Sequence, residues 1–210
     1  MAPARDERGF MMLELLMAMT VMAIALTAMI VVFTSAIFST RRASQTTTAA
    51  ILADAQMEAY RGMTSRDIGL DLSAGTVSAL DSNYKNDPAC ANSTTGKTCA
   101  TDGVATTETG PTGTSPHSCT TINAWYSNTL PCTPSRTVSG STSPASPDGR
   151  SYRIDTYIVQ LAATGGATPQ RAQKQVTVVV RDSAALGTYL ARETTVIDCS
   201  TGQTPNSSDC

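Results

Sequence analysis

Gly9-Phe10-Met11-Met12-Leu13-Glu14 opens the stretch that decides the fold of this chain. The apolar run that begins there continues to Phe33 and contains one charged residue, Glu14. The 24 residues from Phe10 to Phe33 cover roughly 36 Å as an α-helix, more than the ~30 Å hydrocarbon core of a bilayer. We therefore expect a helix that spans a membrane, because the apolar core of a cleaved secretory signal is only about 7 to 15 residues long.

Glu14 does not prevent insertion. The run contains eleven Leu, Ile, Val and Phe residues, which favour insertion by roughly 3 to 7 kcal/mol in total. A carboxylate at the membrane centre costs about 3 kcal/mol and less near the end of a span. The charges that flank the run, Arg5 and Arg8 before it and Arg41 and Arg42 after it, do not decide its orientation.

The helix is expected to continue well beyond the membrane. No Gly or Pro occurs between Phe10 and Arg61, so we predict one helix that spans the membrane over residues 10–35, emerges over 36–62 and stops at Gly62. The run Thr46-Thr47-Thr48 is the place where it is expected to loosen. The emergent half has an apolar face that needs a cover, formed by Ile51, Leu52, Ala55, Ala59 and Met63.

Residues 63–150 are expected to form a variable loop region. Between Ala91 and Arg150, 24 of 60 residues are Ser or Thr, which favours irregular structure over a packed core. Four of the six cysteines lie in this region, and its expected local apolar contact consists of Ile122, Trp125, Tyr126 and Leu130.

Regular structure is expected again over residues 151–198. The segments 152–162, 173–182 and 188–198 are rich in Val, Ile, Thr and Tyr and are separated by Gly165-Gly166 and Ala185-Leu186-Gly187. They predict a three-stranded antiparallel sheet. Such a sheet needs a covered face, and the helix offers one. The predicted fold class is therefore α+β, with a long helix packed on a small antiparallel sheet.

All six cysteines follow the apolar run, and their even number indicates disulfides rather than a metal site. Six cysteines allow fifteen connectivities. Bridges between nearest neighbours would each close a loop worth about 3 kcal/mol, but the spacing does not choose among the possibilities. The cysteines are Cys90, Cys99, Cys119, Cys132, Cys199 and Cys210.

No catalytic set, metal site or cofactor site is expected. The net charge of −2 and sequence pI near 5.3 argue against nucleic-acid binding as the main activity. Gly96-Lys97-Thr98 lacks the first glycine and the strand of a phosphate loop. His117, the single histidine, is interpreted as an ordinary loop residue. The oxygen-rich turn is interpreted as solvated rather than as a calcium loop; its residues are Asp81, Asn83, Asn86 and Asp87.

Gly9-Phe10 followed by Glu14 and a long apolar helix resembles the class III leader and methylation motif of type IV pilins and type II secretion pseudopilins. The resemblance implies that residues 1–9 are a leader, that a prepilin peptidase/N-methyltransferase cuts after Gly9 on the cytoplasmic side and methylates Phe10, and that a type IV pilin-like fold follows. It also implies that Glu14 meets the Phe10 amine of a neighbouring subunit and so sets the register of a filament.

The same resemblance implies other pilins or pseudopilins, an inner-membrane assembly platform and membrane lipid as partners. It also implies a domain outside the cytoplasm, and a cell-surface filament after assembly. The tail 199–210 resembles the tail that a disulfide closes in many pilins, here Cys199 to Cys210. Major pilins often have a helix-bending Pro where this chain has Val31, which favours a minor pilin. A type II secretion pseudopilin, and a membrane-anchored surface protein that binds a ligand without assembling, remain the alternatives.

Overall fold

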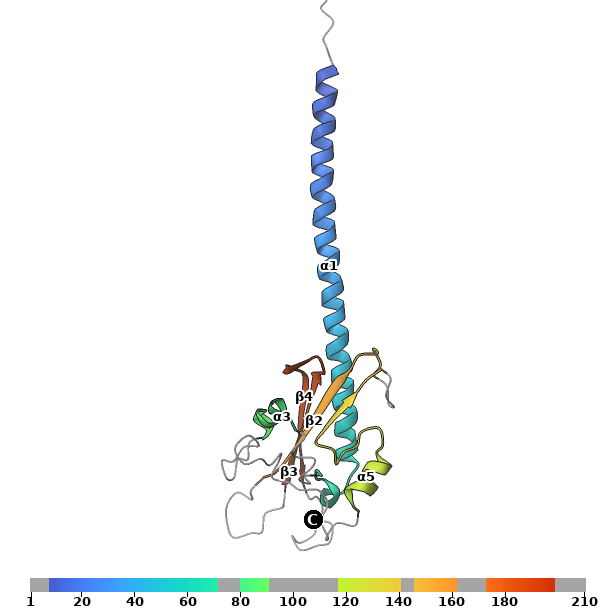
Figure 1. Ribbon diagram of the computed structural model, residues 1–210, viewed down its shortest axis with the longest axis vertical. Coiled ribbons are helices and arrows are strands. Elements are labelled where there is room, and N and C mark those ends of the chain that lie inside the picture. Colours follow the sequence, from blue (N-terminus) through green and yellow to red (C-terminus); the bar gives the residue numbers. More distant parts are fainter. Residues whose placement is uncertain (1–7, 72–79, 91–116, 141–145, 162–172, 199–210) are drawn as a thin grey trace, which may run out of the picture. The chain divides into compact units, whose positions relative to one another are not determined.

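The computed structural model describes residues 8–71, 80–90, 117–140, 146–161 and 173–198. The leader residues 1–7, the tail 199–210, and Cys99, Cys199 and Cys210 lie outside the described residues. Figure 1 shows the elements, which are α1 (Arg8–Arg61), η1 (Ser65–Asp67), α3 (Ser82–Lys85), η2 (Pro88–Cys90), α5 (Cys119–Trp125), β1 (Ser135–Val138), β2 (Tyr152–Leu161), β3 (Gln173–Asp182) and β4 (Ala185–Asp198). The fold class is α+β, as expected.

Helix α1 ends at Arg61, directly before Gly62, where the sequence predicts the stop. The Gly62 amide still donates to the carbonyl of Glu58 at 3.1 Å. The expected loosening at Thr46-Thr47-Thr48 is wrong, since the helix continues through all three residues. Packing overrides the weak helix propensity of threonine there, because Thr48 and the following Ala49 are buried.

The described strands form one antiparallel sheet with four strands in the order β1-β2-β3-β4. The prediction of three strands is therefore wrong in number, because β1 lies in the region expected to be loop. Its four residues pair with β2 from Ser135 opposite Asp155 to Val138 opposite Tyr152. Of its four side chains only Val138 is fully buried, so β1 has no apolar alternation that the sequence could reveal.

The turn between β3 and β4 also differs from the expectation. It is formed by Ser183 and Ala184, and β4 already begins at Ala185. The register shifts between Val180 and Asp182, so that Arg181 pairs with Tyr189 while Asp182 pairs with Ala185. Gly187 thus lies within β4 at this irregularity and not in a separating loop.

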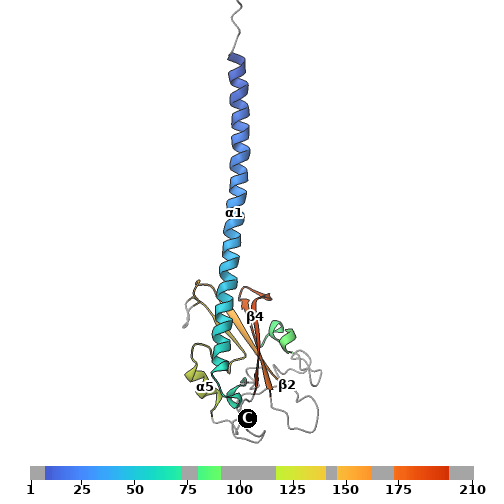
Figure 2. The ribbon, with the colours of Figure 1, turned by 180° about the vertical axis from the view of Figure 1, so that it is seen from behind.

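One face of the sheet packs against α1 from Ala49 onward, and Figures 1 and 2 show the two side by side. Alternate residues of the central strands point to this face. The predicted helix face is confirmed at Leu52, Ala59 and Met63, which are buried or packed against the core, and is wrong at Ile51 and Ala55, which are exposed. The core consists of Ala49, Ala53, Met57, Tyr60, Ile68, Leu70, Val138, Tyr152, Ile154, Ile158, Val176, Val178 and Val180.

A buried polar pair lies in the same interface. Gln56 of α1 is fully buried, and its Oε1 accepts a hydrogen bond of 3.1 Å from NH2 of Arg136 on β1. Burial lowers the pKa of Arg136 to about 10. This hydrogen bond joins the short strand β1 to α1. The pattern of apolar residues in the sequence does not reveal such a contact.

The other face of the sheet is covered as well, by the segment from Leu80 to Cys90 that contains α3 and η2. Tyr84 of α3 stacks on Tyr157 of β2 with ring centroids 4.5 Å apart. The Tyr84 hydroxyl donates to the carbonyl of Thr156 at 2.6 Å, and the Tyr157 hydroxyl donates to the carbonyl of Tyr84 at 3.1 Å. The sheet is therefore sandwiched between a long helix and a short loop segment.

Replacing Val178 by alanine tests the helix-covered face. Val178 is 0% exposed, whereas Val196 on the neighbouring strand is 51% exposed. We expect Val178→Ala to lower the free energy of unfolding by about 2 kcal/mol through lost burial and a residual cavity, and Val196→Ala to change it by less than about 0.5 kcal/mol. Urea unfolding of the full chain in detergent measures both. Equal losses would contradict the assigned core.

Candidate functional site

The sequence motif lies at the start of α1. Gly9 and Phe10 are in its first turn, and Glu14 is one turn further on. The Glu14 side chain is exposed. Positions four residues apart on a helix lie on the same face, so the backbone places Phe10 and Glu14 above one another on one side of α1.

Helix α1 is apolar on every side after this motif. All large apolar side chains between Met12 and Phe38 are 51% to 73% exposed. Its most apolar window has a mean hydropathy of 2.6 with none of its residues buried, and within the described chain it is the one helix long and apolar enough to cross a membrane. A surface helix of a globular protein would carry a polar face.

The hydroxyl groups in this part of α1 are satisfied by the helix itself. Thr20 donates to the carbonyl of Met17 at 2.8 Å, and Thr27 donates to that of Ala23 at 2.9 Å. Thr34 makes the same contact with Ile30 at 3.0 Å. These bonds remove the cost of placing a hydroxyl in hydrocarbon, so the threonines do not oppose a membrane location.

Cys119 and Cys132 form a disulfide with their Cα atoms 5.5 Å apart. This is one of the three nearest-neighbour bridges considered from the sequence. It closes the segment that contains α5, and the Asp71 amide donates to the carbonyl of Cys132 at 2.8 Å. Cys90 is also in a disulfide, and its partner lies outside the described residues.

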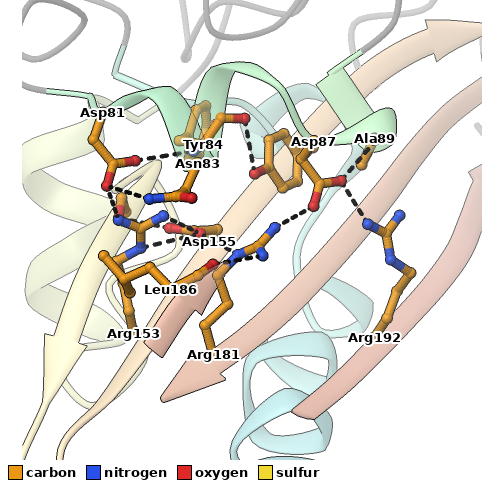
Figure 3. A network of polar contacts seen from close by, with 12 residues as sticks. Asp81, Asn83, Tyr84, Asp87, Ala89, Arg153, Asp155, Arg181, Leu186 and Arg192 are labelled. Carbon is orange, nitrogen blue, oxygen red and sulfur yellow. Dashed lines mark hydrogen bonds and ion pairs between the residues drawn. The ribbon is translucent and has the colours of Figure 1, made fainter. Parts of the chain in front are cut away.

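A second candidate site is a network of charged side chains on the sheet face that α3 covers (Figure 3). Its centre is Asp87, whose side chain is 2% exposed. Asp87 Oδ2 accepts from NH2 of Arg181 on β3, and Oδ1 accepts from NH2 of Arg192 on β4 at 2.6 Å. The amide of Ala89 donates to Oδ1 at 2.9 Å. One loop carboxylate thus binds two neighbouring strands.

The network continues along β2 through Asp155, which is fully buried. Asp155 Oδ2 accepts from Nε of Arg181 at 3.2 Å and from NH2 of Arg153 at 2.9 Å, and Oδ1 accepts from the Ser135 hydroxyl at 2.7 Å. Arg153 in turn donates from NH1 to Asp81 at 2.5 Å. Asp81 is the N-cap of α3 and accepts from the Tyr84 amide at 2.9 Å.

Three carboxylates and three guanidiniums alternate in this network, so their charges balance. Partial burial acts to raise the pKa of Asp81, but hydrogen bonds from Arg153 and the Tyr84 amide outweigh it and lower the pKa to about 2. Burial raises the pKa of Asp155, and hydrogen bonds from Ser135 and Arg153 oppose that rise. Because the buried charges are paired in this way, the arrangement clamps residues 81–89 to the sheet and offers no free acid or base for catalysis.

The sequence interpretation of the oxygen-rich turn is therefore wrong for Asp87, which is buried against arginines and not solvated. Among the described residues, no three His, Cys, Asp or Glu side chains gather in a way that would hold a metal ion. The arginines had a faint signal in the sequence, since Arg153 and Arg181 interrupt apolar strands. Their partners Asp81 and Asp87 lie far away in the chain and had no signal in the sequence.

His117 is also more than a loop residue. Its Nδ1 lies 3.0 Å from Oδ2 of the buried Asp67, and its ring packs edge-on against Trp125 at a centroid distance of 4.4 Å. The Thr64 hydroxyl donates to the same carboxylate oxygen at 3.0 Å. These contacts join the turn after α1 to the start of α5 and give His117 a structural role.

No family model, curated protein or solved structure matches this chain. Its function is therefore inferred from its own residues.

Replacing Asp87 by asparagine tests the clamp. The change leaves Arg181 and Arg192 without their shared carboxylate, and loss of one member of a buried ion pair costs about 3 kcal/mol. We expect the free energy of unfolding to fall by that amount. Asp54→Asn is the matched control, because Asp54 is exposed on α1 and its loss should change stability by less than about 0.5 kcal/mol. Equal effects of the two changes in urea unfolding would refute the clamp.

Proposed function

We propose that this chain is a prepilin that becomes a minor subunit of a type IV pilus-like filament. A prepilin peptidase would cut after Gly9 and methylate the new amino terminus at Phe10. Before assembly, α1 would anchor the subunit in the membrane. During assembly, the same helix would pack into the filament. The observation that carries the proposal is the motif Gly9-Phe10…Glu14 at the start of a helix that is exposed and apolar on every side from Met12 to Phe38.

The chemistry of the motif supports this sequence of events. Gly9 has no side chain, so the backbone there can enter a narrow protease cleft in an extended form. Cleavage would create an ammonium group at Phe10, at the boundary of the membrane. Glu14 is the carboxylate at the matching depth, and charges in lipid pair with one another. Pairing between neighbouring subunits would fix their axial register, because an unpaired ion there costs several kcal/mol.

The described residues support a subunit that contains an apolar anchoring helix and a folded domain. The C-terminal part of α1 packs on the antiparallel sheet, while residues Met12 to Phe38 keep their apolar side chains exposed. Helices with such surfaces associate in hydrocarbon through packing and polar contacts. The lack of a Pro near Val31 favours a minor subunit over a major one.

Two other functions are alternatives. A type II secretion pseudopilin would share the processing, the helix and the fold. A membrane-anchored surface protein would use α1 only as an anchor and would never assemble. Glu14 favours assembly, because a plain anchor gains nothing from a carboxylate inside its apolar run.

Mass spectrometry of the mature chain tests the processing. We expect an amino terminus at Phe10 that carries one methyl group, because cleavage after Gly9 exposes that residue. The same chain expressed without a prepilin peptidase is the control and should retain residues 1–9. A mature chain that still begins at Met1 or Ala2 in a processing-competent cell would reject the pilin assignment.

Replacing Glu14 by alanine tests assembly. We expect Glu14→Ala to leave the protein in the membrane fraction and to lower its amount in sheared filaments by about tenfold or more, because the amine of the neighbour would then be unpaired. Glu58→Ala is the matched control, since Glu58 is an exposed acid on the same helix. Unchanged incorporation of the Glu14 variant would rule out a role in assembly.

A further inference from the structure

An open groove of about 530 Å³ lies beside the charged network, between α3 and the first part of β4. Its walls contain amide and hydroxyl groups from the α3 segment and an arginine and a tyrosine from β4. The residues that matter for binding are Asn83, Asn86, Gly187, Tyr189 and Arg192. The processing motif and the helix α1 take no part in it.

Arg192 is the charged group of the groove. Its side chain is 27% exposed, and NH2 donates to Asp87 Oδ1 at 2.6 Å. The guanidinium lies 5.2 Å from the centroid of the Tyr189 ring. Within the described chain Asp87 is its one hydrogen-bond partner, through NH2 alone (Figure 3). Nε and NH1 therefore remain as donors for a ligand.

The network as a whole is balanced, but the lining of the groove holds the guanidiniums of Arg181 and Arg192 against the single carboxylate of Asp87. The position of Arg192 is nevertheless fixed by the buried carboxylate and by the ring below it. A cation that is held in place before binding loses little side-chain entropy when it meets an anion. This arrangement favours a carboxylate ligand.

The other walls fit a polar ring-shaped ligand. Asn86 is exposed, and Asn83 is half-buried with one amide hydrogen donated to Asp81 Oδ2 at 3.4 Å. The other amide hydrogens and the amide oxygens can bind hydroxyl groups. Tyr189 is 58% exposed; Arg192 lies over one face of its ring, and the rest of the ring offers an aromatic surface, which attracts the slightly positive C–H groups of a sugar ring.

Gly187 leaves the β4 side of the groove bare. A Cβ atom added at this position would meet nothing within 4 Å, so the neighbouring atoms do not require a glycine there. Glycine in a strand interior weakens the strand and often marks a site where a ligand approaches the backbone closely. The open space beside Gly187 thus indicates room for a ligand next to Arg192.

We propose that this groove binds an acidic saccharide, a sugar ring that carries a carboxylate. Arg192 takes the carboxylate, the amides of Asn83 and Asn86 take hydroxyl groups, and Tyr189 supports the ring. A largely apolar small molecule fits less well, because such ligands bind in enclosed apolar pockets. This binding does not depend on filament assembly.

The test uses the full chain in detergent micelles and titrates it with trigalacturonate by isothermal titration calorimetry. We expect binding of trigalacturonate, and binding of the carboxyl-reduced neutral trisaccharide that is weaker by about tenfold or more. Arg192→Gln should weaken binding of trigalacturonate by a similar factor. Arg150→Gln is the matched control, because it removes one positive charge at an exposed position that does not line the groove, and its affinity should equal that of the unchanged protein.

Gly187→Phe gives a second test that leaves Arg192 and Asp87 in place, so it remains informative if Arg192→Gln fails to fold. It should fill the groove and weaken binding by about tenfold or more. The proposal is overturned if trigalacturonate does not bind, if the neutral sugar binds equally well, or if Gly187→Phe binds normally. It is also overturned if Arg150→Gln loses as much affinity as Arg192→Gln. A tripeptide with a free carboxylate that binds in place of the sugar would make the groove a peptide site instead.

Discussion

The apolar surface of α1 between Met12 and Phe38 is the constraint on which the rest of the protein depends. Exposure of one large apolar side chain to water costs about 1.5 to 3 kcal/mol, and every large apolar side chain in this range is more than half exposed. The helix is long and apolar enough to cross a membrane; in the proposed function, lipid or other helices surround this part of it and Glu14 meets a positive partner at the same depth.

A different constraint acts on the sheet, which has two faces to cover. The apolar residues of α1 from Ala49 to Tyr60 cover one of them through small and medium side chains. The segment from Asp81 to Ala89 is too short to bury a comparable apolar area on the other. Ion pairs and the stacked rings of Tyr84 and Tyr157 hold it there instead. The first face is thus held mainly by hydrophobic burial, whereas the second combines a smaller apolar cluster with charge pairing.

The sequence predicted the parts whose signal is local. The bounds of α1, the three long strands and the α+β class follow from periodicity, from the absence of Gly and Pro, and from β-branched residues. Strand β1 could not be predicted from its composition. It is a strand because it pairs with β2. The helix face was placed wrongly in part, since Ile51 is more apolar than Ala53 but Ala53 is the residue buried in the core.

The charged clamp was missed because its pairs are separated by long stretches of chain. Asp87 in a polar turn carries the same local pattern whether it faces water or two arginines. Arg181 next to a run of valines was a hint that a buried charge needed a partner, but no spacing rule names a partner 94 residues away. The proposed processing motif Gly9-Phe10…Glu14 differs in this respect, because the pattern that suggests it lies in six neighbouring residues.

Stability alone does not explain why the clamp is made of charges. Apolar replacements of a buried ion network are often neutral or even stabilising, so three carboxylates and three arginines need another reason. The two acids of the α3 segment pair with arginines on different strands. Asp81 binds Arg153 on β2, while Asp87 binds Arg181 on β3 and Arg192 on β4. An apolar contact would permit the segment to shift along the sheet, but a shift here would leave several buried charges unpaired. The network therefore fixes one position for the segment, and with it the placement of Arg192 beside the groove.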